Sequence, residues 1–156
     1  MGDLTKTFAG KAIVLMVSDP AITNDPFKIV MCQTSASTSS QKNTNVTQTK
    51  CGPKTSASDP TETVSVEGLL MRAKDSGDTT SVDMFDFWAI FKANKNYNWK
   101  LAPEDASAAS NGLPVYSWTG EVTQSDDTLP AEGDATFSAQ ISVVGELDKD
   151  PYTYVP

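Results

Sequence analysis

Two long runs of alternating apolar and polar residues dominate the last third of the chain, Pro114 to Ser125 and Asp134 to Glu146. In the second run, five apolar side chains occupy alternate positions: Ala135, Phe137, Ala139, Ile141 and Val143. A period of two residues is typical of a β-strand with one buried face. The polar residues 126–133 separate the runs, so the pattern predicts an antiparallel pair of strands with one face in water.

Shorter runs upstream predict further strands. The first two are Ala12 to Val17 and Phe27 to Thr34, and the Asp, Asn and Pro residues between them favour turns, which indicates a hairpin. Thr63 to Arg72 and Tyr97 to Leu101 have the same strand character.

The helical pattern lies between Val82 and Ala93. Four apolar residues there fall at i, i+3, i+4 and i+7: Met84, Phe87, Trp88 and Phe91. The preceding segment, Thr80 to Asp83, resembles a capping box, and we expect the aromatic stripe to pack against a sheet. Many strands and one helix predict a mainly β fold, an antiparallel β-sandwich or barrel with one flanking α-helix.

Residues 35–61 are almost wholly polar or small, with Val46 and Cys51 as the main exceptions. Such a segment cannot bury enough apolar surface to offset the entropy of ordering it. It is therefore either a flexible loop or a segment that orders against a partner. Its threonine content allows a weak strand around Asn45 to Lys50 and favours the second interpretation.

The charge of the chain bears on its partners. At 156 residues the chain fits a single domain over 1–156, and twelve basic against twenty acidic residues give a net charge of −8. Sequence-independent binding of DNA or RNA needs a basic surface that neutralises phosphates, so this balance argues against it. A charge of this size also simply keeps a protein in solution.

The residue types available for chemistry are few. The chain has no histidine, which excludes the usual Ser-His-Asp and Cys-His systems and a zinc site that needs histidine ligands. Carboxylates remain, at Asp126-Asp127 and Asp148 to Asp150, in turn-rich segments where acids are ordinarily solvated. We therefore predict a protein that is not an enzyme and that uses no metal or cofactor.

The cysteines and the N-terminus bear on the compartment. The N-terminal residues show no secretory signal pattern, which predicts a cytoplasmic origin without a membrane partner. We expect Cys32 and Cys51 to be reduced and buried, with a disulfide between them as the alternative. The large aromatics Trp99 and Trp118 are either core residues or interface anchors, and their size favours the core.

With these elements placed, the chain resembles the major tail tube proteins of long-tailed bacteriophages. The likeness spans about Lys11 to Glu146. It is carried by these stretches: Cys32 to Ser37, Val46 to Gly52, Val64 to Gly68, the helix at Val82 to Phe91, Gly112 to Thr123, and Glu132 to Glu146.

The resemblance implies a β-sandwich whose subunits join their sheets into hexameric rings with a continuous β-barrel. The rings would stack into a hollow tube in the virion tail, assembled in the host cytoplasm. DNA would pass through the lumen without specific binding, because an acidic wall repels phosphate. The implied partners are copies of the chain, the tape measure protein, the tail terminator, and tail tip or baseplate proteins.

Under this resemblance, Glu67, Glu121, Trp118 and Gln140 are candidates for the lumen or the subunit interface. Asn45, Val46 and Thr47 are candidates for a loop that orders between rings. Two other functions remain open. One is a β-sandwich binding or adhesion module that stacks carbohydrate or another surface on Trp99, Trp118 or Tyr116. The other is a hydrolase that acts through the carboxylates named above.

Overall fold

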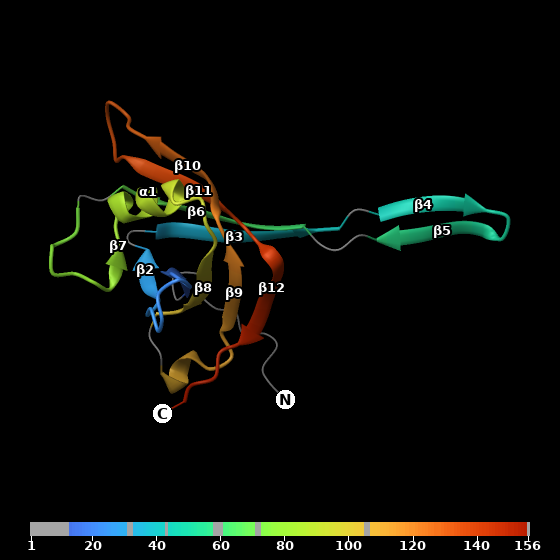
Figure 1. The fold of residues 1–156 in the computed structure, drawn as a ribbon, viewed down its shortest axis with the longest axis horizontal. Helices are drawn as coiled ribbons and strands as arrows, with labels where there is room; N and C mark the ends of the chain where they lie inside the picture. The colour runs from blue at the N-terminus through green and yellow to red at the C-terminus, as the bar shows by residue number, and fades with distance from the viewer. Residues whose placement is uncertain are drawn as a thin grey trace.

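The computed structural model describes residues 13–30, 33–42, 44–57, 61–70, 73–104 and 107–155 (Figure 1). The strands are β1 (Ile13–Ser18), β2 (Lys28–Val30), β3 (Gln33–Gln41), β4 (Thr44–Thr49), β5 (Gly52–Ala57), β6 (Thr61–Leu69), β7 (Ser81–Val82), β8 (Tyr97–Pro103), β9 (Pro114–Gly120), β10 (Val122–Thr128), β11 (Thr136–Ser142) and β12 (Val144–Pro151). The helices are α1 (Met84–Lys92) and the short 3-10 helix η2 (Ala108–Ser110).

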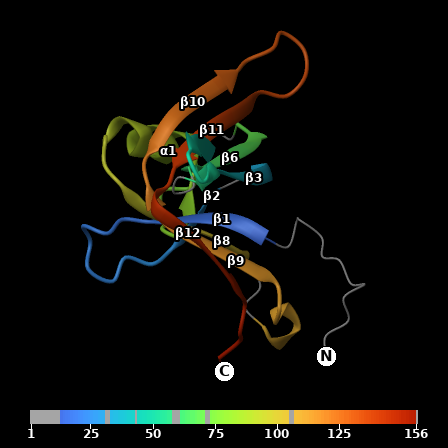
Figure 2. The same ribbon diagram turned by 90° about the vertical axis from the view of Figure 1, so that its right-hand side faces the viewer.

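The strands form two packed sheets and a separate pair. The large sheet has the order β12-β9-β8-β1-β2-β7, and the small sheet has the order β10-β11-β6-β3. Figure 2 shows the small sheet above the large one, with α1 at one side. All pairings are antiparallel except that of β2 with β7. The predicted mainly β, antiparallel architecture with one flanking α-helix is confirmed.

The two alternating runs at the end of the chain pair as predicted, but each run crosses from one sheet to the other. The first run breaks at Glu121, between β9 and β10, and the second breaks at Val143, between β11 and β12. β9 pairs with β12 in the large sheet, whereas β10 pairs with β11 in the small sheet. The alternation continues through both breaks, so the pattern alone could not show the crossing. β12 also runs on to Pro151, past the predicted end at Glu146.

A close backbone contact holds this crossing. The amide of Ser142 donates to the carbonyl of Glu121 at 2.9 Å. A Cβ atom added to Gly120 would lie 1.7 Å from the carbonyl oxygen of Ser142, which real side chains never do. Glycine is therefore required at 120 by this close approach of two backbones.

The core lies between the two sheets. Its fully buried side chains come from both sheets: Leu15, Val64, Val66, Trp99 and Ile141. α1 inserts Phe87 into this core, with ring centroids 6.4 Å from Trp99 of the large sheet and 5.9 Å from Phe137 of the small sheet. One aromatic ring thus contacts both layers.

The predicted aromatic stripe packs only in part. Phe87 is buried and Phe91 packs against the core, but Trp88 remains 48% exposed. The helix lies at an edge of the sandwich, beside β7 and β10. The helix cap also differs from the prediction. The capping box was predicted over Thr80 to Asp83, whereas in the structure it begins at the N-cap Asp83.

Residues 35–61 were expected to be either a flexible loop or a segment that orders against a partner, and the described part of the segment forms strands β3, β4 and β5. β3 pairs with β6 along its length, with Ser37 opposite Ser65. β4 and β5 then form a hairpin that extends away from the body (Figure 1). Pairing with β6 satisfies the backbone of β3 whatever its side chains, so polar composition did not prevent a strand. The predicted strand at Asn45 to Lys50 is confirmed as β4.

We call the β4–β5 hairpin, residues 44–57, the arm. Its described side chains are exposed, including Cys51 in the turn, which corrects the expectation that this thiol is buried. Cys32 lies outside the described residues, so a disulfide is not tested. Residues 31 and 32 of the second predicted strand also lie outside, between β2 and β3.

Candidate functional site

The outer face of the small sheet gathers two of the predicted residues. On β6, Val64 and Val66 are 0% and 1% exposed, so the alternation turns Glu67 to the outside. On β11, Ala139 and Ile141 are buried, so Gln140 is exposed in the same way. Both predicted side chains therefore lie on one outward face.

The register of the strands fixes their neighbours. Glu67 stands opposite Ser138 of β11, and Gln140 stands opposite Ser65 of β6. A shallow hollow in this face is lined by the polar residues Ser65, Glu67, Gln124, Asp126, Ser138 and Gln140. These polar side chains make a hydrated surface without a deep binding cavity.

The small sheet carries charge of one sign. Its four strands contain Glu62, Glu67, Asp126 and Asp127 and no lysine or arginine. Of these, Glu67 and Asp126 lie on the outer face, and this face would repel phosphate, because binding phosphate requires basic groups. Among the described residues, no group of three or more potential ligands could hold a metal ion.

Both outer strands of the small sheet, β3 and β10, are edge strands. β3 has nine residues and β10 has seven. An edge of this length presents unpaired backbone N–H and C=O groups, which readily pair with another chain. The small sheet can therefore be extended on either side by a second copy.

The other two candidates for this surface lie elsewhere. Glu121 is half-buried at the crossing between β9 and β10. Trp118 is 5% exposed, on β9 opposite Trp99. The expectation that both tryptophans are core residues is confirmed, and neither is available on the surface of the subunit.

This burial removes the stacking platform on which a carbohydrate-binding function would depend. Trp99 is 1% exposed, and its ring N–H donates to the carbonyl of Gly120 at 2.9 Å. Tyr116 is half-buried and has the Lys149 ammonium 5.4 Å from its ring centroid. None of the three rings proposed for stacking, Trp99, Trp118 and Tyr116, therefore lies open on the surface of the subunit.

The carboxylates also lie differently from the prediction. Asp126 and Asp127 are in β10, and Asp148 and Asp150 are in β12, rather than in turns. Consecutive residues of a strand face opposite sides, so Asp126 and Asp127 diverge. The pairs are exposed, and Asp126 and Asp127 line different hollows of the surface.

The arm holds the three residues predicted for contacts between rings. Asn45, Val46 and Thr47 lie in β4, and Val46 is 62% exposed. Thr47 is opposite Lys54 of β5, so Val46 and Lys54 lie on opposite faces of the hairpin. At the turn, the Thr49 hydroxyl donates to the carbonyl of Gly52 at 2.6 Å.

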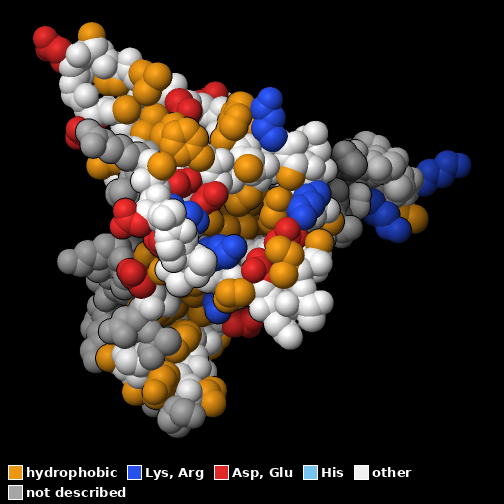
Figure 3. Space-filling model, turned by 60° about the vertical axis from the view of Figure 1, so that its left-hand side comes forward, with side chains coloured by type: hydrophobic (Ala, Val, Ile, Leu, Met, Phe, Trp, Pro, Cys, Tyr) orange, Lys and Arg blue, Asp and Glu red, His pale blue; other side chains and the backbone are white. Residues whose placement is uncertain are grey.

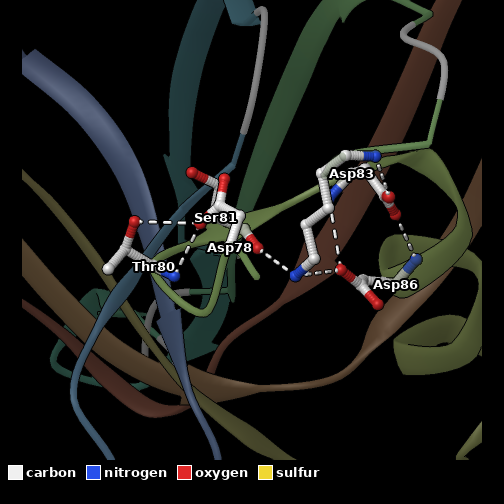
Figure 4. A network of polar contacts seen from close by, with 6 residues as sticks. Asp78, Thr80, Ser81, Asp83 and Asp86 are labelled. Carbon is white, nitrogen blue, oxygen red and sulfur yellow. Dashed lines mark hydrogen bonds and ion pairs between the residues drawn. The ribbon is translucent and has the colours of Figure 1, made fainter. Parts of the chain in front are cut away.

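A polar network joins the start of α1 to β7 and to the segment before it (Figure 4). Asp83 accepts hydrogen bonds from the backbone N–H groups of Asp86 and Lys74, each at 2.9 Å. The Lys74 ammonium lies 2.7 Å from the Asp86 carboxylate and donates to the carbonyl of Ser81 at 2.6 Å. This network ties the segment before the helix to its first turn.

The same contacts shift two pKa values. Desolvation acts to raise the pKa of Asp83, but the backbone hydrogen bonds from Lys74 and Asp86 outweigh it, so the pKa is lowered. The hydrogen bond to Asp86 raises the pKa of Lys74. Both groups are therefore held in their charged forms near neutral pH.

An apolar groove lies beside the helix. Phe85 and Trp88 are 58% and 48% exposed. They line a groove of about 240 Å³ together with Leu69, Phe137 and Asp127. The helical period assigned Trp88 to the packed side, and the outward position of Phe85 was the one available signal.

Solved structures of similar fold are components of phage-type tails. A chain of the SPP1 tail tube aligns with a TM-score of 0.71 at 11% identity, over 94% of this chain and 80% of that one. A chain in the virion of a native gene transfer agent particle aligns with a TM-score of 0.63 at 12% identity, over 92% and 99%. A chain in the cap that terminates the anti-feeding prophage tube aligns with a TM-score of 0.61 at 9% identity, over 97% of both.

Comparisons of sequence, by contrast, find no match. No family model matches the chain, and no curated protein matches it in sequence. Among the described residues, no helix is long and apolar enough to cross a membrane. The likeness rests on three-dimensional arrangement, and by that arrangement the chain has the fold of tail tube proteins.

Proposed function

We propose that this chain is the structural subunit of a phage-type tail tube in the virion. Copies join into rings, hexameric as the family resemblance implies, and the rings stack into a hollow tube. The observation that carries this proposal is the small sheet: it has two free edges and an outer face with acidic and no basic residues. It can be extended into a closed barrel, and closure removes the exposed edges.

In this assembly the outer face of the small sheet lines the lumen. Glu67, Gln140 and Asp126 then face the passing DNA. An acidic wall keeps phosphates at a distance, so DNA slides through without a bound state. Glu121 and Trp118, which are not on this face, have structural roles at the crossing and in the core.

The arm supplies contacts between rings. Its exposed position and its lack of a core fit a segment that is stabilised by a neighbouring ring, with Asn45, Val46 and Thr47 at the contact. The tube would meet a tape measure protein inside and terminator and tip or baseplate proteins at its ends. The similarity to chains of an anti-feeding prophage cap and baseplate supports such partners.

Negative-stain microscopy of the purified protein over a concentration series tests the proposal. The expected result is rings at low concentration and tubes at high concentration, without enzymatic turnover. Two variants test the lumen. E67K should retain tubes but retard DNA passage or bind DNA. Lys28→Glu, which changes a charge in the large sheet, should retain tubes without either effect on DNA. A chain that stays monomeric at every concentration would refute the proposal.

A further inference from the structure

The arm and the strand before it carry charge of one sign. Residues 33–57 contain three lysines, Lys42, Lys50 and Lys54, and no acidic residue. This segment holds three of the twelve basic residues and none of the twenty acidic residues of the chain. The remainder therefore has nine basic against twenty acidic residues, a net charge of −11.

The hairpin formed by β10 and β11 carries the opposite charge. Residues 122–142 contain four acids, Asp126, Asp127, Glu132 and Asp134, all exposed, and no basic residue. In Figure 1 this hairpin and the arm project from opposite ends of the molecule. Figure 3 shows acidic side chains at the upper left end and basic side chains at the right end.

The apolar surfaces of the two ends also match. The arm exposes Val46. The groove between α1 and β10 exposes Phe85 and Trp88, and Asp127 of the acidic hairpin lines the same groove. The arm thus carries an apolar side chain on one face and Lys54 on the other, and the far end of the molecule carries an apolar groove next to an acidic hairpin.

The arm cannot fill the groove of its own copy. It continues the line of β3 and β6 outward, away from the β10–β11 hairpin (Figures 1 and 2). A two-stranded hairpin is marginally stable in water by itself, so an arm with exposed faces gains most from a partner. Contacts between two different surfaces of the same chain are heterologous, the type that builds rings and filaments.

A nucleic acid fits the arm less well than a second copy does. Residues 33–57 have three cations, but the net charge of −11 on the remainder would repel a long polyanion that lies along the molecule. No aromatic residue occurs in 33–57 on which bases could stack. The acidic hairpin of another copy carries four exposed carboxylates and needs no such extension.

We propose that the arm of one copy docks in the groove between α1 and β10 of a copy in the adjacent ring. Val46 enters beside Phe85 and Trp88, while Lys50 and Lys54 lie near the carboxylates of the β10–β11 hairpin. This inference rests on the proposed tube assembly and specifies its contact surfaces. Attraction between the hairpins steers the encounter, and burial of Val46 holds the docked arm.

The first test neutralises the arm. K42Q/K50Q/K54Q should raise the concentration needed for tube formation about tenfold at low salt, since three exposed charge pairs together contribute roughly that factor. The control K28Q/K100Q/K149Q removes the same charge outside both hairpins and should change it less than about twofold. Sedimentation and negative-stain microscopy measure assembly, and circular dichroism verifies folding.

The second test reverses charge on either side. K50E/K54E alone and D127K/E132K/D134K alone should each fail to form tubes at low salt, because like charges then meet. A mixture of the two variants should form tubes, since each arm again finds a hairpin of opposite sign. Assembly of either variant alone, or failure of the mixture while wild-type tubes form, would overturn the inference and leave the proposed function standing.

The third test locates the contact. In a C32S background, Cys51 at the tip of the arm should cross-link through a short bismaleimide to A131C in the β10–β11 turn, in tubes and not in monomers. The control N111C, near η2, should not cross-link. The reverse pattern would place the arm elsewhere, and binding of a DNA oligonucleotide by the wild-type arm would replace the second copy with nucleic acid. Wild-type protein that never assembles would overturn the proposed function and this inference together.

Discussion

The β3–β6 pair of the body and the β4–β5 pair of the arm are neighbouring parts of one long ribbon with very different support. Both pairs are antiparallel and rich in serine and threonine. β6 turns Val64 and Val66 into the core, whereas the described side chains of the arm are all exposed. Hydrogen bonding makes both into strands, but only the first gains from apolar burial. We therefore expect the body to be stable by itself, whereas the stability of the arm depends on contact with a partner.

The largest difference between the two regions should come from glycine. Gly120→Ala places a Cβ on the backbone of Ser142 and should cost roughly 3 kcal/mol or more of global stability. Gly52→Ala in the arm meets no atom within 4 Å, although its φ of +107° strains alanine. It should leave global unfolding nearly unchanged. Urea titration of both variants measures this, and equal losses would contradict the comparison.

The next largest difference between the body and the arm should come from truncating a valine in each. Val66→Ala, fully buried in the body, should lose about 2 kcal/mol through lost burial and the cavity left behind. Val46→Ala, 62% exposed on the arm, should change monomer stability by less than about 0.5 kcal/mol but weaken tube formation. Thermal unfolding of the monomer and sedimentation of tubes give the two measurements. A stability loss for Val46→Ala would mean that the arm packs on its own body.

The helix cap offers a pH-dependent probe of the body alone. The pKa of Asp83 is lower in the folded chain than its ordinary value of 3.8. Its contribution to stability is thus fully present above that value and is lost as pH falls through the folded pKa. Asp83→Ala should cost about 1–2 kcal/mol at neutral pH and should reduce this acid dependence. The arm variant Lys54→Gln is the control and should leave the acid limb of the stability curve in place.

The smallest effect should separate two tryptophans inside the body. Trp99→Phe and Trp118→Phe remove the same atoms from buried sites, but only Trp99 donates its ring N–H to an acceptor, Gly120. The ring N–H of Trp118 has no hydrogen-bond partner among the described residues. Trp99→Phe should therefore be the more destabilising by about 1 kcal/mol. Denaturant titration decides, and the opposite order would point to a partner of Trp118 that the subunit alone does not provide.

The sequence was sufficient for elements that bury one face. Alternation at Val64 and Val66, and again along 135–143, predicted the strands, and the spacing around Phe87 predicted the helix. It was insufficient where backbone contacts decide. The crossing at Glu121 leaves the alternation intact, and β3 forms because β6 lies beside it. Of the candidate surface residues, Glu67 and Gln140 came together because both follow the period of two, whereas Trp118 was too large and apolar to stay on the surface.

The opposite projection of the basic arm and the acidic hairpin has a consequence for the proposed polymer as a whole. A stack built by their contact is directional. One end exposes basic arms that have no partner, and the other end exposes acidic β10–β11 hairpins that have no partner. Growth at the two termini then has different kinetics and different salt dependence. A protein that binds the end with exposed acidic hairpins must carry positive charge, and a protein that binds the end with exposed arms must carry negative charge. The charge of the subunit therefore determines which closing protein fits which end.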